Sequence, residues 1–461
     1  METIKKRIRK ILLENYIQEN NDNFFRTDMV VKDSDKSDIL NIKDKLNEKG
    51  FKIWIVGGAV RDTVKNAIKL SKNPTDETLD TPKDFDLVTD AVPGQVIDIF
   101  KDASFVSNIL NIGESFAIMF LVTKHGNRYE LATLRSESGG GRKPDSVQYE
   151  KTIEKDAQRR DLKINALYYE ILGTNENGFY GIVHDLVGGI DDIKTNSLNT
   201  VGDPRERFNE DPLRKIRAIR FASKMGSQIP DNVADAIREG GTSLTDPTGK
   251  IVSNERIREE FYKGVKSSKS VRYFLALLVS FDFIKHLFAD LRMSPDSFVE
   301  ERHPIVLLAN LLKRNGIKEI ERNLSTKKYS ADEINSVKFL VSLLDLKENT
   351  ASAIKRFYLQ KAKNSNPKIN EKFYPMTDDV IYKFADLNHI DKLKIKNFLR
   401  LANEFVQPSE LLKSLGYERE ALGMAIARLE KEFYKNPNRV KNIISSGDAE
   451  EIKKLIFIGK S

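Results

Sequence analysis

The sequence contains no cysteine among its 461 residues. This absence excludes disulfide bonds and thiolate zinc sites, and it fits a reducing compartment such as the cytoplasm. No apolar run is long enough to cross a membrane, and the lysine-rich start, residues 1–10, is not followed by the apolar core of a signal peptide. We therefore expect a cytoplasmic protein with no disulfide partner and no membrane partner.

Hydrophobic residues make up 40% of the chain and charged residues 31%, which is typical of a globular protein. The chain is longer than a single hydrophobic core can hold, so we expect two to four domains. The net charge of +8 favours a polyanionic partner, although many lysine-rich proteins carry such a charge for solubility alone.

A pair of glycines opens the most informative stretch, residues 54–90. Gly57 and Gly58 follow an apolar run, residues 51–56, which predicts a buried strand, and precede an apolar-periodic stretch, which predicts a helix. Backbone N–H groups at such a junction face an anion, and Arg61 adds a planar positive group. The ordinary alternative for two glycines is a simple turn.

Two aspartates follow beyond a polar insert, residues 71–83, which we expect to be a surface loop. Asp84 and Asp86 lie two positions apart at the start of a predicted strand, so both carboxylates point the same way. Such a pair repels unless a cation lies between its members, and hard divalent ions prefer these oxygens. Together the motifs indicate a triphosphate cradle beside a magnesium site; a solvated strand edge is the alternative for the aspartates alone.

Glu130 lies in a mostly apolar predicted strand, residues 128–134. It could complete an acidic trio with Asp84 and Asp86, as a third metal ligand or as a proton acceptor. Pairing with Arg128 or Arg135 at a sheet edge explains the residue equally well.

The overall pattern predicts an α+β protein. Residues 1–50 are expected to form a short lysine-rich helix, a polar stretch from Asn20 to Asp35, and a helix ending at Gly50. A helix beginning near Pro93 and strands over 115–123 and 128–134 then predict a small mixed sheet with helices on one face. From about residue 150 onward the pattern is almost wholly helical, with a brief interruption near residues 179–183.

Two further segments carry candidate binding residues. Arg160 and Asp161 supply donors for a phosphate and an acceptor for a ribose hydroxyl, and a solvated helix face is their alternative. After Pro212, which suits a first helical turn, Arg214, Arg217 and Arg220 form one row at three-residue steps. We expect this row to offer its guanidinium groups outward, with ordinary helix salt bridges as the alternative.

Asp211 lies three residues before Arg214, close enough for both to act on one partner. A carboxylate acceptor beside a planar donor can satisfy the edge of a nucleobase. Glu210 and Asp211 also lie near the positive end of the helix.

These segments resemble, in the same order, those of class II tRNA nucleotidyltransferases (CCA-adding enzymes) and bacterial poly(A) polymerases. The resemblance covers about residues 51–263 and is carried by segments 57–62, 83–91, 159–169, 185–192, 202–222 and 253–261. It implies a polymerase-β-type nucleotidyltransferase head followed by all-helical domains. The implied division is an N-terminal helical extension (1–50), a catalytic head (51–190), a base-recognising neck (191–265), a helical body (266–350) and an RNA-binding helical tail (351–461).

The resemblance also implies roles for single residues. Asp84 and Asp86 would hold two Mg²⁺ ions. The residues implied to bind the nucleotide are Gly57, Gly58 and Arg61 at the triphosphate, Arg160 and Asp161 at the ribose, Glu210, Asp211 and Arg214 at the base, and Arg217 and Arg220 beside it. Asp185, Gly188 and Gly189 match a hinge motif.

The sequence departs from the family pattern in the length of the 71–83 insert and at Leu162 and Lys163, where Phe-Thr is usual. We expect no appended metal phosphohydrolase domain, because its His-Asp signature occurs only at His184-Asp185, inside the hinge motif, and the chain has five histidines.

Three functions follow as hypotheses. The first is template-independent addition of CCA to tRNA, with CTP and ATP as substrates. The second is addition of AMP to RNA ends by a poly(A) polymerase, and the third is a catalytically inactive RNA-binding relative, against which the intact acidic pair argues. Residues 408–417 and 421–423 resemble the tail of CCA-adding enzymes and favour the first. Residues 351–374, with six basic residues, one glutamate and interleaved aromatics, are predicted to hold the tRNA. A solvated lysine-rich face with buried aromatics is the alternative.

Overall fold

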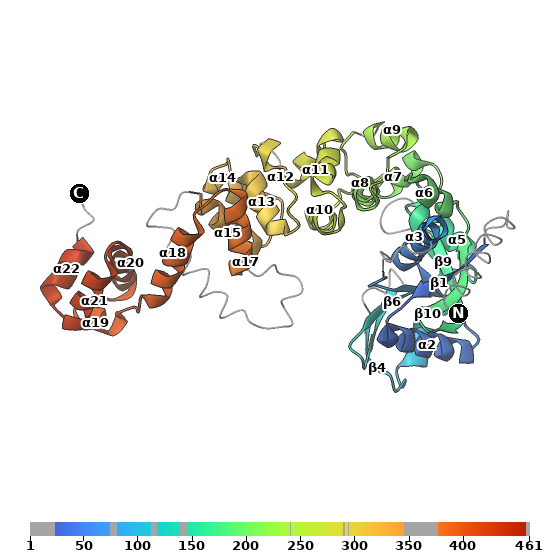
Figure 1. Ribbon diagram of the computed structural model, residues 1–461, viewed down its shortest axis with the longest axis horizontal. Helices are drawn as coiled ribbons and strands as arrows, with labels where there is room; N and C mark the ends of the chain where they lie inside the picture. Colours follow the sequence, from blue (N-terminus) through green and yellow to red (C-terminus); the bar gives the residue numbers. More distant parts are fainter. Residues whose placement is uncertain are drawn as a thin grey trace. The chain divides into compact units, whose positions relative to one another are not determined.

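The computed structural model describes residues 24–73, 81–111, 118–138, 146–239, 241–288, 291–293, 295–344 and 377–457. Contacts divide the chain into two compact units (Figure 1). Unit 1 comprises Met1–Glu260, Ser268–Ser270 and Leu277–Phe283, and unit 2 comprises Phe261–Ser267, Val271–Ala276 and Ile284–Ser461. All strands of the described residues lie in unit 1, which confirms the predicted α+β class with a helical C-terminal region.

Unit 1 is built on an eight-stranded mixed sheet, with strand order β1-β10-β9-β2-β3-β6-β5-β4. Its strands are β1 (Phe24–Val30), β2 (Ile53–Val56), β3 (Asp86–Thr89), β4 (Val106–Asn111), β5 (Ile118–Thr123), β6 (Arg128–Thr133), β9 (Leu167–Asn175) and β10 (Gly178–Asp185). Only the β3–β6 pair of this sheet is parallel; every other neighbouring pair is antiparallel. Strands β7 (Arg135–Ser138) and β8 (Ser146–Tyr149) form a separate antiparallel ribbon.

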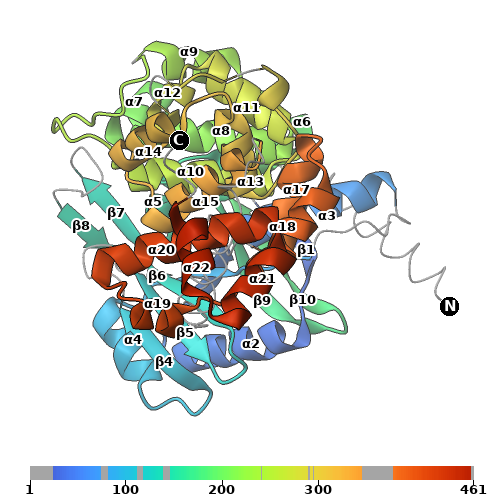
Figure 2. The ribbon, with the colours of Figure 1, turned by 90° about the vertical axis from the view of Figure 1, so that its left-hand side faces the viewer.

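Helices pack on both faces of the sheet in unit 1, not on one face as the pattern predicted. The larger core packs against α2 (Asp33–Glu48), α3 (Gly58–Lys72) and α4 (Pro93–Phe100). Figure 2 shows α2 and α4 side by side near strand β4. The smaller core, on the other face, contains Trp54 and Val56 together with Ile153 and Ala157 of α5 (Ile153–Gln158). Strand β2 is therefore buried on both faces, which explains its continuous apolar run.

The expected helical extension over residues 1–50 is wrong for residues 24–30, which form edge strand β1 and pair with β10. Phe25, Thr27 and Met29 are more buried than Arg26 and Asp28 between them, so the strand shows the two-residue period of a half-covered sheet edge. Because polar residues flank β1 on both sides, the alternation is difficult to recognise in the sequence alone. The helix that was expected to end at Gly50 is confirmed as α2.

The prediction of almost continuous helix beyond residue 150 is also wrong. Strands β9 and β10 form a long hairpin, which continues the sheet from β2 outward to β1. The first residues of β9, Leu167, Tyr168 and Tyr169, are fully buried, so the strand begins without polar alternation. A short apolar run of this kind does not distinguish a strand from a buried helix.

The chain leaves β10 through a turn that Asp185 holds. Its carboxylate accepts hydrogen bonds from the backbone N–H groups of Gly188 and Gly189 at 2.9 and 2.8 Å, and also from those of Val187 and Ile190. A Cβ atom on Gly189 would lie 2.3 Å from the Lys163 carbonyl oxygen, so this approach requires glycine. The hinge role of this motif stays a prediction.

Helices complete unit 1. They are η2 (Lys163–Asn165), α6 (Gly189–Thr195), α7 (Pro204–Glu210), α8 (Leu213–Met225) and α9 (Asp231–Glu239), with parts of α10 (Asn254–Ser267) and α11 (Val271–Ser280). Pro212 directly precedes α8, as predicted, and Gly226 ends it with a φ of +65°.

In unit 2 every element of the described residues is a helix. The elements are α12 (Ile284–Phe288), η3 (Pro295–Ser297), α13 (Pro304–Leu312), α14 (Ile317–Thr326), α15 (Ala331–Ser342), α17 (Asp378–Leu387), α18 (Lys392–Glu404), α19 (Ser409–Ser414), α20 (Arg419–Lys435), α21 (Pro437–Ser446) and α22 (Ala449–Phe457). All residues of α13 are buried, so this helix is central to the packing. No helix of the described residues is long and apolar enough to span a membrane.

The five-part domain division stays a prediction, because the contacts resolve two units only. The basic segment 351–374, most of the 71–83 insert and the glycines at 139–141 lie outside the described residues.

Candidate active site

Gly57 lies against Asp86, the second residue of the acidic pair, as the sequence predicted. Gly57, between β2 and α3, has a φ of +76°, which favours glycine over other residues. A Cβ atom on Gly57 would lie 3.6 Å from Asp86 Oδ2, and one on Gly58 would lie 3.7 Å from Arg61 Nη2. The turn therefore brings the N-terminus of α3 close to a carboxylate and a guanidinium.

Asp86 begins β3, and Glu130 is its register partner on the parallel strand β6. Burial raises the pKa of Asp86, and Asp84 adds to the rise, while Arg160 and Arg61 oppose it. The Asp86 residue remains partly open to solvent, so the rise reflects the crowding of its carboxylate by protein atoms. Burial, followed by the charge of Asp86, also raises the pKa of Glu130.

These carboxylates fit a divalent cation. Adjacent negative charges with raised pKa values form a site that a cation would stabilise, and all the donor atoms are hard oxygens. Within the described ranges no three acidic or histidine side chains are gathered as a metal site. Glu130 thus lies beside Asp86 without completing a trio with Asp84. The charges of Arg160, Arg128 and Arg135 lower the pKa of Glu130 and so oppose the rise.

Arg61 is only 1% exposed, although it is the expected triphosphate ligand. Its Nε lies 3.0 Å from Asp62 Oδ1, and its Nη1 donates to Asn165 Oδ1 at 2.9 Å. Its Nη2 lies within ion-pair distance of Asp62 but makes no hydrogen bond. A buried guanidinium nitrogen with an unused donor, next to a glycine turn, suits an anionic ligand.

Asp156, on α5, is a residue that sequence reasoning missed. It is fully buried, and its two oxygens accept hydrogen bonds from Arg159 at 2.6 and 2.9 Å, from Arg160 at 3.0 and 3.1 Å, and from the Tyr168 hydroxyl at 2.6 Å. Arg160 Nε also donates to Tyr168 at 2.9 Å. Asp156 therefore orients both adjacent arginines. The three- and four-residue spacings to Arg159 and Arg160 were the available signal.

Asp161 faces the arginine row of α8, not solvent. It accepts from Arg217 at 2.8 and 2.7 Å, and Glu260 of α10 accepts from Arg220 at 2.5 Å. Burial raises the pKa of Asp161, but Arg217 outweighs this effect, and the pKa falls to about 2. The expectation that the row points freely outward is therefore wrong: each guanidinium already has a carboxylate partner.

Phe221 is a second residue that the sequence did not single out. Its ring lies under three guanidinium groups, at centroid distances of 4.1 Å for Arg220, 5.6 Å for Arg61 and 5.7 Å for Arg217. These distances are within the range of cation–π attraction. One buried aromatic ring thus connects the triphosphate candidate on α3 with the row on α8.

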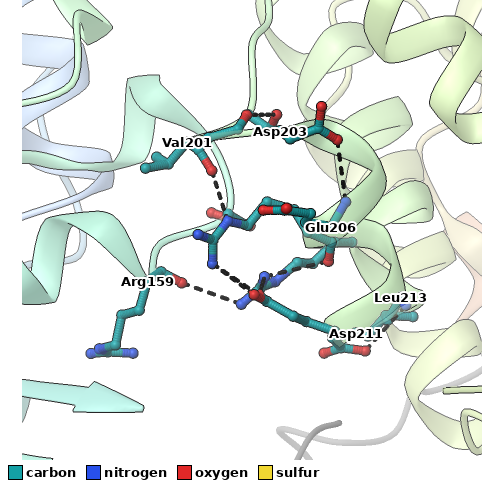
Figure 3. Close-up of polar contacts among 12 residues, drawn as sticks. Arg159, Val201, Asp203, Glu206, Asp211 and Leu213 are labelled. Carbon is teal, nitrogen blue, oxygen red and sulfur yellow. Dashed lines mark hydrogen bonds and ion pairs between the residues drawn. The ribbon is translucent and has the colours of Figure 1, made fainter. Parts of the chain in front are cut away.

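The motif at the start of α8 is also internally bonded (Figure 3). Arg214 donates to Glu210 at 2.6 Å and to the Arg159 carbonyl at 3.2 Å. Asp211 accepts from the Leu213 N–H at 3.1 Å and from Arg256 at 2.9 Å. Asp211 and Arg214 are therefore neighbours that bind different partners, and Arg256 is a further residue of the site.

The helix before this motif has its own cap. Asp203 accepts from the Glu206 N–H at 3.4 Å, and Arg207 donates to the Val201 carbonyl at 2.8 Å (Figure 3). Arg207 also donates to Glu210, which fixes that carboxylate between two arginines. The segment 201–214 is thereby held by side-chain bonds at both ends.

Comparison with known proteins finds similar sequences and similar folds. Residues 53–199 match the family described as Poly A polymerase head domain. The CCA-adding enzyme of Latilactobacillus sakei subsp. sakei is 29% identical over 408 residues, covering 86% of this chain and 93% of that protein. The CCA-adding enzyme of Limosilactobacillus fermentum is 35% identical over 248 residues. This match covers 53% of this chain and 53% of that relative, so the chain spans about half the length of the relative.

Poly(A) polymerase I of Escherichia coli O6:H1 is 33% identical over 214 residues, covering 45% of this chain and 41% of that protein. Among solved structures, the Bacillus stearothermophilus CCA-adding enzyme in complex with CTP aligns with a TM-score of 0.57 and 20% identity, covering 88% of this chain and 94% of that chain. This likeness shows a shared fold. Over residues 53–199 the chain matches the Poly A polymerase head domain family, and over most of its length it is similar to a CCA-adding enzyme.

Proposed function

We propose that this protein adds C, C and A to the 3′ end of tRNA without a template, with CTP and ATP as substrates. The observation that carries the proposal is the acidic residue Asp86 lying against the Gly57 turn, with the unused Arg61 Nη2 beside Gly58. This arrangement suits a triphosphate held next to a cation site. The match to a CCA-adding relative over most of both chains supports tRNA as the acceptor.

Asp84 and Asp86 would hold two Mg²⁺ ions, which lower the pKa of the attacking 3′-hydroxyl and neutralise the departing pyrophosphate. The N-terminus of α3 and Arg61 would bind the triphosphate, since both present N–H donors at the turn. Arg160, held by Asp156, would donate to the ribose side of the nucleotide. Glu130, the register partner of Asp86 on β6, would accept a proton or position that carboxylate.

Base choice would depend on the α8 motif. Asp211, Arg214 and Arg217 present acceptors and planar donors whose orientations are fixed by Arg256, Glu210 and Asp161. A rigid set of hydrogen-bonding groups rejects bases that leave it unpaired. Glu210 would orient Arg214 through their ion pair. Arg220, which packs on the ring of Phe221, would contact the nucleotide beside the base.

Asp211→Ala is expected to relax base choice more than it weakens triphosphate binding. The Asp211 carboxylate retains lone pairs for an exocyclic amine, which cytosine and adenine carry and uracil lacks. Losing one base contact costs about 1–3 kcal/mol of discrimination, so UTP use relative to CTP should rise about tenfold. Single-nucleotide kcat/KM values for the four triphosphates measure this ratio.

Glu239→Gln is the control for Asp211→Ala, because Glu239 pairs with Arg205 at the surface of the same unit. This control should leave base choice as in the wild type. Unchanged rejection of UTP and GTP by Asp211→Ala would show that the base pocket lies elsewhere.

Sequencing the products made from a tRNA that ends before its CCA tests the proposed function. We expect C, C and A in that order, and no growth beyond A. The second candidate is poly(A) synthesis, which the Poly A polymerase head match favours. Long A tails on tRNA and on unstructured RNA alike would establish that candidate instead.

A tRNA-maturing enzyme acts where tRNA is made, so we place the protein in the cytoplasm. Its RNA contacts are proposed to come from the helical C-terminal half. The basic segment 351–374 remains the predicted tRNA-binding segment and lies outside the described residues.

A further inference from the structure

Lys224, in the last turn of α8, has no role in the site described above. Its side chain is half-buried, and among the described residues it makes no hydrogen bond or ion pair. Burial lowers the pKa of Lys224, and the nearby charges of Arg61, Arg220 and Lys65 lower it further, with Asp62 opposing them. An ammonium group in this position is costly for the fold without a negative partner.

The position of Lys224 links it to the glycine turn. Arg61 reaches from α3 to the ring of Phe221 on α8, three residues before Lys224. Arg61 Nη2, which is buried and makes no hydrogen bond, borders Gly58, and the neighbouring Gly57 borders Asp86. Residues three apart on a helix share a face, so Lys224 lies on the side of α8 where Arg61 contacts Phe221.

Resting on the proposed function, we propose that Lys224 binds the distal phosphates of the incoming nucleoside triphosphate together with Arg61, and retains them as pyrophosphate after transfer. The transferred α-phosphate belongs beside Asp86, where the 3′-hydroxyl oxygen attacks phosphorus and the bond to the bridging oxygen breaks. The leaving pyrophosphate supplies negative charge to a group in which the charges of Arg61, Arg220 and Lys65 oppose that of Lys224 and Asp62 offsets them.

Two simpler explanations make different predictions. A lysine in the last turn of a helix can stabilise the exposed carbonyl groups, and Lys224→Met would then lower the melting temperature. A solvated lysine would change neither stability nor binding. If Lys224 instead binds phosphate and has no negative partner in the unliganded protein, Lys224→Met should bind phosphate more weakly. Its melting temperature should then be unchanged or higher.

The test is calorimetric titration of the full chain with inorganic pyrophosphate, and with CTP, in the presence of Mg²⁺ and without RNA. Lys224→Met should weaken both affinities about tenfold or more, as expected for a lost charge-assisted hydrogen bond. Lys224→Arg, which keeps the charge, should restore most of the affinity. Lys215→Met is the matched control, because Lys215 lies on the same helix, is 4% exposed and donates to the Gly241 carbonyl.

The outcomes separate this inference from the proposed function. Wild-type protein that binds neither CTP nor pyrophosphate overturns both. Wild-type binding with unaltered affinity in Lys224→Met overturns the role of Lys224 alone. A rise in the KM for tRNA with an unchanged affinity for pyrophosphate would assign Lys224 to an RNA phosphate and contradict the triphosphate assignment. If Lys224→Met does not fold, the lysine is structural, and Lys224→Gln titrated in the same way decides the phosphate role.

Discussion

Replacing Asp86 with asparagine is expected to abolish nucleotide incorporation and to leave the protein at least as stable as the wild type at pH 7. Asp86 lies against the Gly57 turn and beside Glu130, where the proposed cation would be held. Loss of one metal-binding carboxylate should reduce kcat/KM about a thousandfold or more. Primer extension measures the loss, and Asp84→Ala should behave in the same way.

The stability side of this prediction follows from the sign of the pKa shift. The pKa of Asp86 is raised in the folded state, so the wild type is most stable while Asp86 is protonated and loses stability as the pH rises through that pKa. Asparagine carries no charge and avoids this loss. The melting temperature of Asp86→Asn should therefore equal or exceed the wild-type value at pH 7, and the difference should disappear below pH 3.8.

Asp98→Asn is the control for Asp86→Asn, because it removes an exposed carboxylate that pairs with Lys101 at the surface of α4. It should change neither incorporation nor the melting temperature measurably. Near-normal turnover in Asp86→Asn would remove the proposed metal site. A large loss of stability at pH 7 would show that the Asp86 carboxylate is a structural ligand.

Asp156→Asn is expected to destabilise the protein and to raise the KM for nucleotides together. Asp156 is fully buried and neutralises Arg159 and Arg160, so its removal leaves two partly buried cations without their common partner. Breaking a buried ion pair from one side costs about 3–5 kcal/mol. Denaturant unfolding at pH 7 measures this loss, and nucleotide titration measures the effect on Arg160.

The difference in the free energy of unfolding between the wild type and Asp156→Asn should become smaller at acidic pH. Although burial raises the pKa of Asp156, the Arg160 and Arg159 charges outweigh it and lower the pKa to about 2. The stabilisation is thus fully present above pH 3.8 and is lost as the pH falls through about 2. Asp191→Asn, which removes an exposed carboxylate paired with Lys194, should be close to wild type throughout.

A wild-type nucleotide KM in a destabilised Asp156→Asn protein would limit Asp156 to a structural role. Wild-type stability at pH 7 would contradict the ion-pair cluster itself. Tyr168→Phe provides an independent check, because it removes one donor to Asp156 and leaves both arginines in place.

Local motifs were sufficient to predict that the glycine turn and Asp86 lie together. Gly57 and Asp86 are placed together as their spacing around a strand, a helix and a second strand predicted. Glu130 could not be assigned from the sequence, because a carboxylate on a strand acquires its neighbours only when that strand is paired. The parallel pairing of β3 with β6 places it beside Asp86.

Composition and local pattern by themselves determined the α+β class, the glycine turn, the acidic pair and the arginine row at three-residue steps. The tertiary structure alone decided that the row is paired with Asp161 and Glu260, that Asp156 holds two arginines, and that Phe221 lies under three guanidinium groups. It also decided that residues 24–30 close the edge of the sheet. The physical reason is that these partners are far apart in the sequence. Arg61 and Asn165, for example, are hydrogen-bonded but lie 104 positions apart. The strength of such a contact depends on its burial in the folded protein, which a short segment of sequence does not reveal.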